Sequence, residues 1–322
     1  GARLPSSVAE EYRDHRLYRL WCSRAPYYNR YRSRVEKEKI MLFRTEIEIP
    51  KADFEIQPAE RMLFVGSCFA DNLGKRFVEN RFRATVNPFG VMYNPASILH
   101  TVERCLEGMK VSDASEVSDA SDAITEKMKT ETPRVAVFTL GTNHVYILKE
   151  TGEIVDNCMK RPQRLFEERE LSVDECTEYL QKAIEPFEKV IVTVSPIRYA
   201  KYGYHGSQLS KATLQLAADK LLKANPEVVS YFPAYEIMND ELRDYRFYKE
   251  DMLHPSDQAV EYIWERFRAT YFGKKAVQFL EEWRPIKEAL GHKPFNPDCE
   301  ATKQFLAKTE EKKRQFEQKY SL

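Results

Sequence analysis

From residue 41 onward, short apolar runs rich in valine, isoleucine and phenylalanine alternate with longer amphipathic stretches. The short runs are typical of buried strands in a parallel sheet, and the amphipathic stretches are typical of helices that cover such a sheet. The pattern predicts strands over residues 62–65, 84–86, 135–140, 190–194 and 228–232. It predicts helices over residues 69–82, 96–106, 173–184, 208–223 and 257–271.

The regular alternation of strand and helix indicates the fold class. Consecutive parallel strands need crossover connections, and helical crossovers put helices on both faces of the sheet. We therefore expect an α/β fold with three layers, α/β/α, around a mainly parallel, five-stranded sheet. This domain is expected to span residues 41–272.

Both ends of the chain differ in composition. Residues 1–40 interleave arginines with tyrosines and a tryptophan, which predicts an N-terminal extension, either a helical arm or a segment upstream of a natural start at Met41. The same composition could bind single-stranded nucleic acid by stacking and phosphate contact. Residues 110–132 carry serines among acidic residues and are expected to form an exposed excursion. Residues 273–322 predict a C-terminal helical extension, whose charged stretch over 302–319 is expected to be a solvated arm.

Composition narrows the classes of function. The chain has 322 residues, of which 43% are hydrophobic, enough for one large core. Fifty basic and fifty acidic side chains cancel, so no net field attracts nucleic acid or an anionic membrane, and neither partner is expected. Six cysteines without a CxxC spacing are typical of free thiols, and no apolar run has the length of a membrane span or a signal peptide. The expected location is therefore cytoplasmic.

A candidate nucleophile lies where the first predicted strand turns into a helix. Gly66 and Ser67 fall at this turn, and parallel α/β folds form sites beyond the carboxyl ends of strands, beside helix N-termini that offer backbone N–H groups. Ser67 could attack a carbonyl there, although both residues are also common in ordinary turns and helix caps. Cys68 competes for the role, because a helix N-terminus lowers the pKa of a thiol. Because neighbouring positions at such a turn point in different directions, Ser67 and Cys68 are not expected to face the same substrate atom.

An acid and an imidazole follow the last predicted strand. Asp251 and His254 are three residues apart, just ahead of a predicted helix. On a turn this spacing lets the carboxylate bind one ring nitrogen and stabilise the imidazolium, while the other nitrogen serves a nucleophile. A turn-capping aspartate beside a surface histidine is the alternative. The six histidines lack metal-ligand spacings and no glycine-rich phosphate loop is present, so neither a metal nor a cofactor is expected.

The string GSCFA, which begins at Gly66, resembles the GSCFA family when taken with the Asp-x-x-His block that begins at Asp251. That family is similar to the SGNH or GDSL hydrolases, and the resemblance runs from about residue 43 to residue 271, leaving both ends outside it. It implies a flavodoxin-like SGNH hydrolase fold. It also implies a catalytic triad, with Ser67 as nucleophile, His254 as base and Asp251 as the acid that orients the base.

The resemblance further implies an oxyanion hole. Its donors would be the backbone amide of Ser67, the backbone amide of Gly90 in a tight loop after the second strand, and the side chain of Asn143 after the third strand. Two positions differ from the SGNH pattern: no acid precedes Ser67, and His144 stands where the pattern has aspartate. Without the resemblance, the loop at Gly90 is typical of an ordinary turn.

Two further segments resemble the family. Residues 157–160 carry Met159 where the family block carries histidine, which favours a pocket wall over an acid-base or metal role. Arg198 and His205, after the fourth strand, are candidates for substrate binding on the acyl-acceptor side of the pocket. A capped loop ahead of a helix explains the same residues without a binding role.

The resemblance implies a serine-dependent hydrolase of short acyl esters, such as acetyl esters, of a carbohydrate or a related polyol. An O-acyltransferase that uses the same site is the first alternative. A non-catalytic carbohydrate-binding or scaffold protein is the second, and the departures before Ser67 and at His144 support it.

Overall fold

A computed structural model of the chain describes residues 44–107, 132–156, 158, 161–292 and 299–322. The chain divides into two compact units, Gly1–Glu48 and Ile49–Leu322, and the elements below belong to the second. The extension predicted over residues 1–40 and the excursion predicted over 110–132, apart from residue 132, lie outside the described residues.

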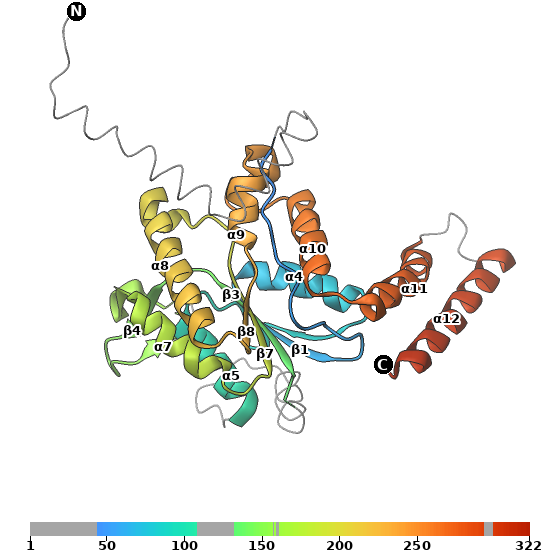
Figure 1. Cartoon of the computed structure of the whole chain (residues 1–322), viewed down its shortest axis with the longest axis horizontal. Coiled ribbons are helices and arrows are strands. Elements are labelled where there is room, and N and C mark those ends of the chain that lie inside the picture. The colour runs from blue at the N-terminus through green and yellow to red at the C-terminus, as the bar shows by residue number, and fades with distance from the viewer. Residues whose placement is uncertain (1–43, 108–131, 157, 159–160, 293–298) are drawn as a thin grey trace, which may run out of the picture. The chain divides into compact units, whose positions relative to one another are not determined.

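Five parallel strands form the main sheet (Figure 1). They are β1 (Arg61–Gly66), β2 (Arg83–Val86), β3 (Val135–Leu140), β7 (Lys189–Val194) and β8 (Val229–Tyr231). The spatial order is β2-β1-β3-β7-β8, and every neighbouring pair is parallel. This is the doubly wound order of flavodoxin-like folds. The predicted α/β class and the five-stranded parallel sheet are confirmed.

Helices cover both faces of this sheet (Figure 1). The longer ones are α4 (Cys68–Glu79), α5 (Pro95–Glu107), α7 (Val173–Ile184), α8 (Gly203–Ala224), α10 (Asp257–Tyr271), α11 (Lys274–Gly291) and α12 (Glu300–Tyr320). Short helical turns are η2 (Gln163–Leu165), η3 (Ala200–Tyr202), α9 (Ala234–Glu236), η4 (Ile237–Leu242) and η5 (Tyr245–Phe247). Helices α5, α7 and α8 pack on one face and α4 and α10 on the other, which gives the three layers.

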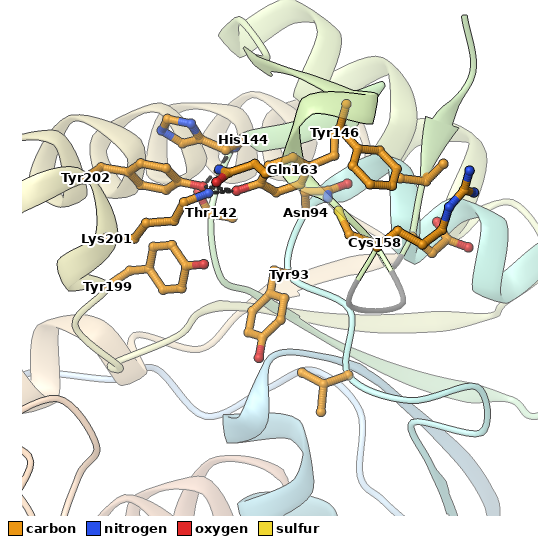
Figure 2. A pocket seen from close by; sticks show the side chains of 15 residues that line it. Tyr93, Asn94, Thr142, His144, Tyr146, Cys158, Gln163, Tyr199, Lys201 and Tyr202 are labelled. Carbon is orange, nitrogen blue, oxygen red and sulfur yellow. Dashed lines mark hydrogen bonds between the residues drawn. The ribbon is translucent and has the colours of Figure 1, made fainter. Parts of the chain in front are cut away.

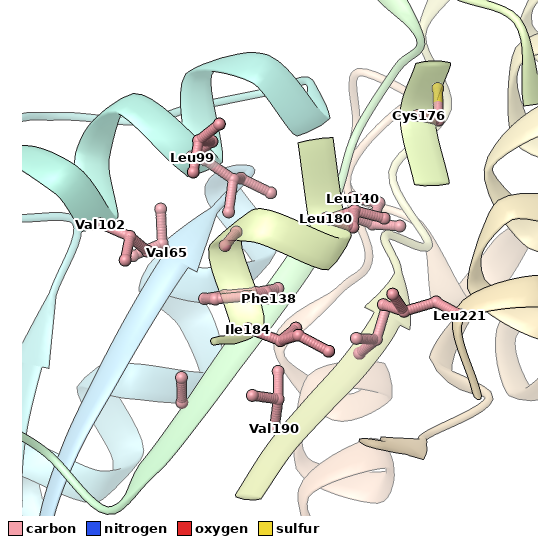
Figure 3. Packing of buried hydrophobic residues seen from close by; sticks show 14 of the residues in the cluster. Val65, Leu99, Val102, Phe138, Leu140, Cys176, Leu180, Ile184, Val190 and Leu221 are labelled. Carbon is pink, nitrogen blue, oxygen red and sulfur yellow. The ribbon is translucent and has the colours of Figure 1, made fainter. Parts of the chain in front are cut away.

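The face covered by α5, α7 and α8 has a largely aliphatic core (Figure 3). Val65, Phe138 and Val190 from three neighbouring strands meet Leu99 of α5 and Leu180 of α7, and all five side chains are buried. Truncating such a side chain to alanine costs about 2–5 kcal/mol, because it leaves a cavity in a close-packed interior. Burial of this face therefore holds the helix layer against the strands.

The opposite face of the sheet is aromatic. Successive residues of a strand point to opposite faces, so Phe64 lies on the side of β1 away from Val65, and its ring is 4.9 Å from that of Phe77 on α4. Phe77 in turn lies 5.0 Å from Trp264 and 5.8 Å from Phe267, both on α10. These ring contacts hold α4 and α10 together over the sheet.

Serine caps define two helices whose bounds agree with the sequence pattern. Ser172 accepts the N–H of Glu175, and the Glu175 side chain accepts the N–H of Ser172, which is a complete capping box ahead of α7. Ser256 accepts the N–H of Ala259 at the start of α10. Both helices span the predicted residues, 173–184 and 257–271.

Helices α11 and α12 form the C-terminal part of the unit. Phe316 of α12 is 4% exposed, and its ring lies 4.9 Å from that of Phe279 and 5.2 Å from that of Trp283 on α11. Lys319 also pairs with Glu282 at 2.7 Å. Most of α12 is exposed, as predicted for a solvated arm, including Phe305 and Leu306. The prediction missed that the helix is anchored to α11 through Phe316, one of its two buried residues.

A second sheet, which the sequence pattern did not predict, follows β3. It consists of β4 (His144–Leu148), β5 (Ile154–Val155) and β6 (Phe166–Glu170), paired antiparallel in the order β5-β4-β6. Most of β6 is charged and exposed, so its apolar periodicity is weak. Because β4 begins just after β3 ends, this sheet stands at the carboxyl edge of the main sheet, where α/β proteins bind their ligands.

Across the described ranges, no helix combines the length and the hydropathy that a membrane span requires. Nor do the described residues group three or more histidine, cysteine, aspartate or glutamate side chains in a way that could hold a metal ion. The five cysteines in this part of the chain are free thiols.

Candidate active site

Ser67 lies in a tight turn between β1 and α4. Gly66 has a φ of +143°, and a Cβ at this position would collide with the backbone of Thr139 on β3, so only glycine fits here. The Gly66 N–H donates to Asn87 Oδ1 at 2.9 Å. Ser67 caps α4, since its Oγ accepts the N–H of Phe69 at 3.2 Å. The turn thus carries Ser67 at the carboxyl end of β1.

Asp251 and His254 lie in a loop that closes on itself. The Lys249 N–H donates to His254 O at 2.8 Å. Inside the loop, Asp251 Oδ1 accepts the backbone N–H groups of Leu253 at 2.8 Å and of His254 at 2.9 Å. Asp251 Oδ2 lies 2.6 Å from His254 Nδ1. The carboxylate is therefore held against one nitrogen of the imidazole ring.

These hydrogen bonds set the protonation of the pair. The backbone N–H groups of His254 and Leu253, followed by the His254 ring, lower the pKa of Asp251 to about 2. The carboxylate is ionised at neutral pH and accepts the proton on Nδ1. Nε2 is then the ring nitrogen of His254 that can take up a proton.

Ser67 and His254 are not hydrogen-bonded to each other in the described structure. Ser67 is 2% exposed, and its Oγ lies 3.1 Å from Thr139 Oγ1. The His254 side chain is 37% exposed. Such contacts are often long in free enzymes and tighten only when substrate binds. The structure assembles the Asp251–His254 pair and the serine turn separately, and does not join them.

The two predicted amide donors of the oxyanion hole are engaged within the protein. The Ser67 N–H donates to Thr139 O at 3.0 Å, and the Gly90 N–H donates to Asn87 O at 2.9 Å. The backbone N–H of Cys68, at the first position of α4, has no acceptor among the described residues. Because helix N-termini leave such groups unpaired, the Cys68 N–H is an open donor directly after Ser67.

The side chain of Asn143, the third predicted donor, is hydrogen-bonded to a backbone carbonyl. Its Nδ2 donates to Leu171 O at 2.7 Å, and its Oδ1 is buried without a partner in the described part of the chain. Since Leu171 O can only accept, the amide orientation follows from this hydrogen bond. The Nδ2 group that was predicted to donate to an oxyanion is therefore already donating to a backbone carbonyl.

Arg198 contacts the loop that carries the Asp251–His254 pair. Its backbone N–H donates to Leu253 O at 3.0 Å, and its Nη1 donates to Met252 O at 3.1 Å. The guanidinium also lies 4.3 Å from the ring centroid of Tyr204. Met252 has a φ of +56°, a backbone conformation that side chains rarely adopt. Arg198 thus supports a strained turn of this loop.

The remaining candidates are His205, Cys68 and Met159. His205 is exposed near the start of α8. Cys68 is half-buried, and its Sγ lies 3.7 Å from Tyr93 Oη. Met159 lies outside the described residues.

A cavity of about 460 Å³ opens beside the serine turn (Figure 2). The second sheet, the segment ahead of α5 and η3 form its walls, which are rich in tyrosine: Tyr93, Tyr146, Tyr199 and Tyr202. Tyr93 links the cavity to the turn, because its hydroxyl contacts Cys68 and its carbonyl oxygen accepts the N–H groups of Gly141 and Thr142, each at 2.8 Å. Cys158, from the segment 157–160 that was predicted to form a pocket wall, lines this cavity, whereas none of the predicted catalytic, oxyanion or substrate-binding residues does. The other walls were not predicted because they depend on the second sheet.

His144 forms part of the cavity wall. Its ring stacks on Tyr202, with centroids 3.5 Å apart and planes 7° from parallel. Burial lowers the pKa of His144, against the opposing effect of Glu170 and of Glu168, whose Oε1 lies 3.2 Å from Nδ1. The replacement of the aspartate of the SGNH pattern therefore supplies a flat, neutral surface.

Lys211 of α8 joins the carboxyl ends of two strands. Its Nζ is buried and donates to Gly141 O at 2.7 Å and to Ser195 O at 2.9 Å. Burial lowers the pKa of Lys211 to about 7. The neighbouring Ser210 Oγ accepts the N–H of Asn143 at 3.0 Å. These contacts fix the loops after β3 and β7.

Fold and site together define the class: a doubly wound α/β protein with a serine and an Asp–His pair beyond the carboxyl ends of its strands. The GSCFA family model matches residues 61–128 and 112–267. The chain belongs to the GSCFA family. The model described as GSCFA domain protein, C-terminal domain, matches residues 283–322, so the expectation that residues after 271 lie outside the family is wrong.

Two solved structures are similar to the chain at a low level. An acetylxylan esterase of Geobacillus stearothermophilus is 11% identical, with 68% of this chain and 98% of that chain covered and a TM-score of 0.37. A carbohydrate esterase family 3 protein of Talaromyces cellulolyticus is 9% identical, with 69% and 99% covered and a TM-score of 0.32. Similarity this low carries no argument about activity or substrate. No curated protein sequence matches the chain significantly.

Proposed function

We propose that the chain is a serine-dependent hydrolase of short acyl esters, such as acetyl esters, of a carbohydrate or a related polyol. The observation that carries this proposal is the Asp251–His254 pair. Its carboxylate is ionised and bound to Nδ1 at 2.6 Å, so that Nε2 is available as a base. Ser67, at the carboxyl end of β1, is the nucleophile that this base would serve.

In the proposed reaction, Ser67 Oγ attacks the acyl carbonyl while His254 Nε2 takes the hydroxyl proton. Asp251 stabilises the imidazolium that forms. The tetrahedral intermediate expels the alcohol, which receives the proton from His254. Water then attacks the acyl-serine with His254 again as base, and releases the acid and free Ser67.

This mechanism requires two local rearrangements. Ser67 Oγ leaves Thr139 Oγ1, 3.1 Å away, and the exposed His254 ring turns toward it. The oxyanion needs donors, and a single donor typically contributes about 3 kcal/mol to the transition state. The open Cys68 N–H supplies one, while the amides of Ser67 and Gly90 and the Asn143 side chain take part only if substrate draws them from their present acceptors.

The test is turnover of p-nitrophenyl acetate by the wild-type protein, Ser67→Ala, Cys68→Ser and His254→Ala. Loss of turnover in the Ser67 and His254 variants, with Cys68→Ser close to wild type, supports the serine mechanism. Turnover that survives in Ser67→Ala and disappears in Cys68→Ser makes the thiol the nucleophile instead. Inactivity of the wild-type protein removes the hydrolase proposal for this ester.

Two alternatives have observations in their favour. The engaged amides and the missing Ser67–His254 contact favour a non-catalytic carbohydrate-binding or scaffold protein. The cavity beside Ser67 could hold an acceptor alcohol, which favours an O-acyltransferase, and product that partitions to an added alcohol would identify one. The free cysteines fit a reducing compartment, and we propose the cytoplasm.

A further inference from the structure

The cavity beside Ser67 contains an amide donor that has no acceptor among the described residues. Asn94 lies just ahead of α5 and is 6% exposed, and its Oδ1 accepts the N–H of Ser97 at 2.9 Å. Asn94 lines the cavity, and its Nδ2 donates to no described residue. Because Oδ1 is already held by the Ser97 N–H, Nδ2 is the atom of this amide that is suited to a ligand with an acceptor oxygen.

Aromatic rings form the wall near this donor. The Tyr199 ring lies 5.1 Å from that of Tyr202 and 6.2 Å from that of Tyr93, and Tyr202 is backed by His144. Figure 2 shows these side chains and Asn94 around the same space. Tyrosine offers an apolar face with a polar tip, which matches a ring that has C–H groups on its faces and hydroxyls on its edge.

Two of the charged groups in the cavity wall, Lys201 and Asp156, are paired within the protein. Lys201 Nζ lies 3.2 Å from Glu168 Oε2 and also bonds the Tyr146 hydroxyl. Asp156 lies 2.8 Å from His100 Nδ1. Arg161 is exposed, and its guanidinium is 5.7 Å from the ring centroid of Phe166. The pairing of Lys201 and Asp156 favours a neutral ligand beside them, whereas the Arg161 guanidinium has no carboxylate partner among the described residues, so an anionic sugar is included in the test below.

We propose that this cavity binds a neutral sugar ring, with Asn94 Nδ2 donating to a ring or hydroxyl oxygen and Tyr199 and Tyr202 packing on the ring. The volume of about 460 Å³ is in the range of small-molecule sites. The role of this cavity in binding the alcohol part of the ester rests on the proposed function. Sugar binding by the cavity can be tested independently of turnover.

The experiment uses the full chain carrying Ser67→Ala, so that binding is measured without reaction. Xylotriose, cellotriose and glucuronic acid are the probes, followed by saturation-transfer NMR and calorimetry. Asn94→Asp keeps an oxygen for the Ser97 N–H and removes only the donor, whereas Asn94→Ala removes both. We expect at least about tenfold weaker binding of the neutral sugars in both variants, and a lower unfolding temperature only in Asn94→Ala.

The possible results either support the proposed sugar site or contradict it. Neutral sugar binding that weakens in Asn94→Asp and in Tyr199→Ala, at an unchanged unfolding temperature for Asn94→Asp, supports it. Binding of glucuronic acid alone, equal binding in Asn94→Asp, or no binding of either oligosaccharide up to ~10 mM overturns it. If the wild-type protein binds the sugars but hydrolyses no ester, the proposed function is wrong and the sugar site stands. If it hydrolyses sugar esters and Asn94→Asp leaves KM unchanged, the sugar site is wrong and the proposed function stands.

Discussion

Asp251→Asn tests the proposed mechanism at a single atom. The amide oxygen can keep the position of Oδ1, which accepts the N–H groups of Leu253 and His254 at 2.8 and 2.9 Å. The amide nitrogen then faces His254 Nδ1, where a carboxylate oxygen now lies at 2.6 Å. A donor in that place moves the ring proton from Nδ1 to Nε2, so the nitrogen meant for Ser67 can no longer accept a proton.

The expected loss is large because the tautomer changes while the loop keeps its shape. In a Ser–His–Asp triad this substitution lowers kcat by about 10⁴-fold, and we expect the same order here with little change in KM. Acid stability should change as well. The pKa of Asp251 is lowered from 3.8 to about 2, so its stabilising effect is present above pH 3.8 and is lost as pH falls toward 2. Asp251→Asn should lack this acid-dependent part.

The assay is the initial rate of p-nitrophenyl acetate hydrolysis over a range of substrate concentrations and pH. Asp244→Asn is the matched control, because Asp244 is also a loop aspartate that accepts a backbone N–H, from Arg246 at 2.9 Å. It should retain wild-type turnover. If Asp251→Asn stays within tenfold of wild type while Ser67→Ala is inactive, then Asp251 does not set the tautomer of His254 and the triad is refuted.

Three further predictions concern the parts that support the site. Arg198→Met removes the charged hydrogen bond to Met252 O, which is worth about 1.5–3 kcal/mol. We therefore expect kcat to fall about tenfold at a similar KM, and Arg198→Lys to recover part of the lost kcat. A rise in KM alone would instead make Arg198 a substrate contact. Lys211 has a pKa of about 7 when folded and 10.5 as the reference, so the unfolded chain holds one more proton between these pH values, and stability rises with pH there by up to about 1.4 kcal/mol per unit. Denaturant unfolding should show this rise in the wild-type protein and not in Lys211→Met; parallel pH profiles would contradict it. Phe316→Ala should cost about 3–5 kcal/mol of unfolding free energy, whereas Phe305→Ala, at a 42% exposed position on the same helix, should cost little; equal effects would mean that α12 is not packed on α11.

Local signals made most of the fold predictable from the sequence. The strands are buried runs, and α7 and α10 begin after serines that cap them, so their bounds follow from a few neighbouring residues. Strand β6 escaped prediction because it carries charged, exposed residues and depends on pairing with β4. The packing of α12 was not predicted because it depends on Phe316 meeting α11, a contact that the charged pattern of the helix does not reveal.

The candidate site divides in the same way. Asp251 and His254 are three residues apart, so their contact could be predicted from spacing alone. The hydrogen bond of the Asn143 side chain could not be predicted, because its acceptor is the carbonyl of Leu171, which follows the second sheet in the sequence. Asn94 could not be predicted as a site residue, because its position in the cavity wall depends on tyrosines that are distant in the sequence.

The most direct test of the central claim is to map the residue that is covalently labelled. The wild-type protein is treated with a fluorophosphonate, digested, and analysed by tandem mass spectrometry, with His254→Ala as the control for activation. The account predicts one adduct, on Ser67, formed far more slowly in His254→Ala. An adduct on Cys68, or no adduct on Ser67 in a protein that hydrolyses p-nitrophenyl acetate, would contradict it.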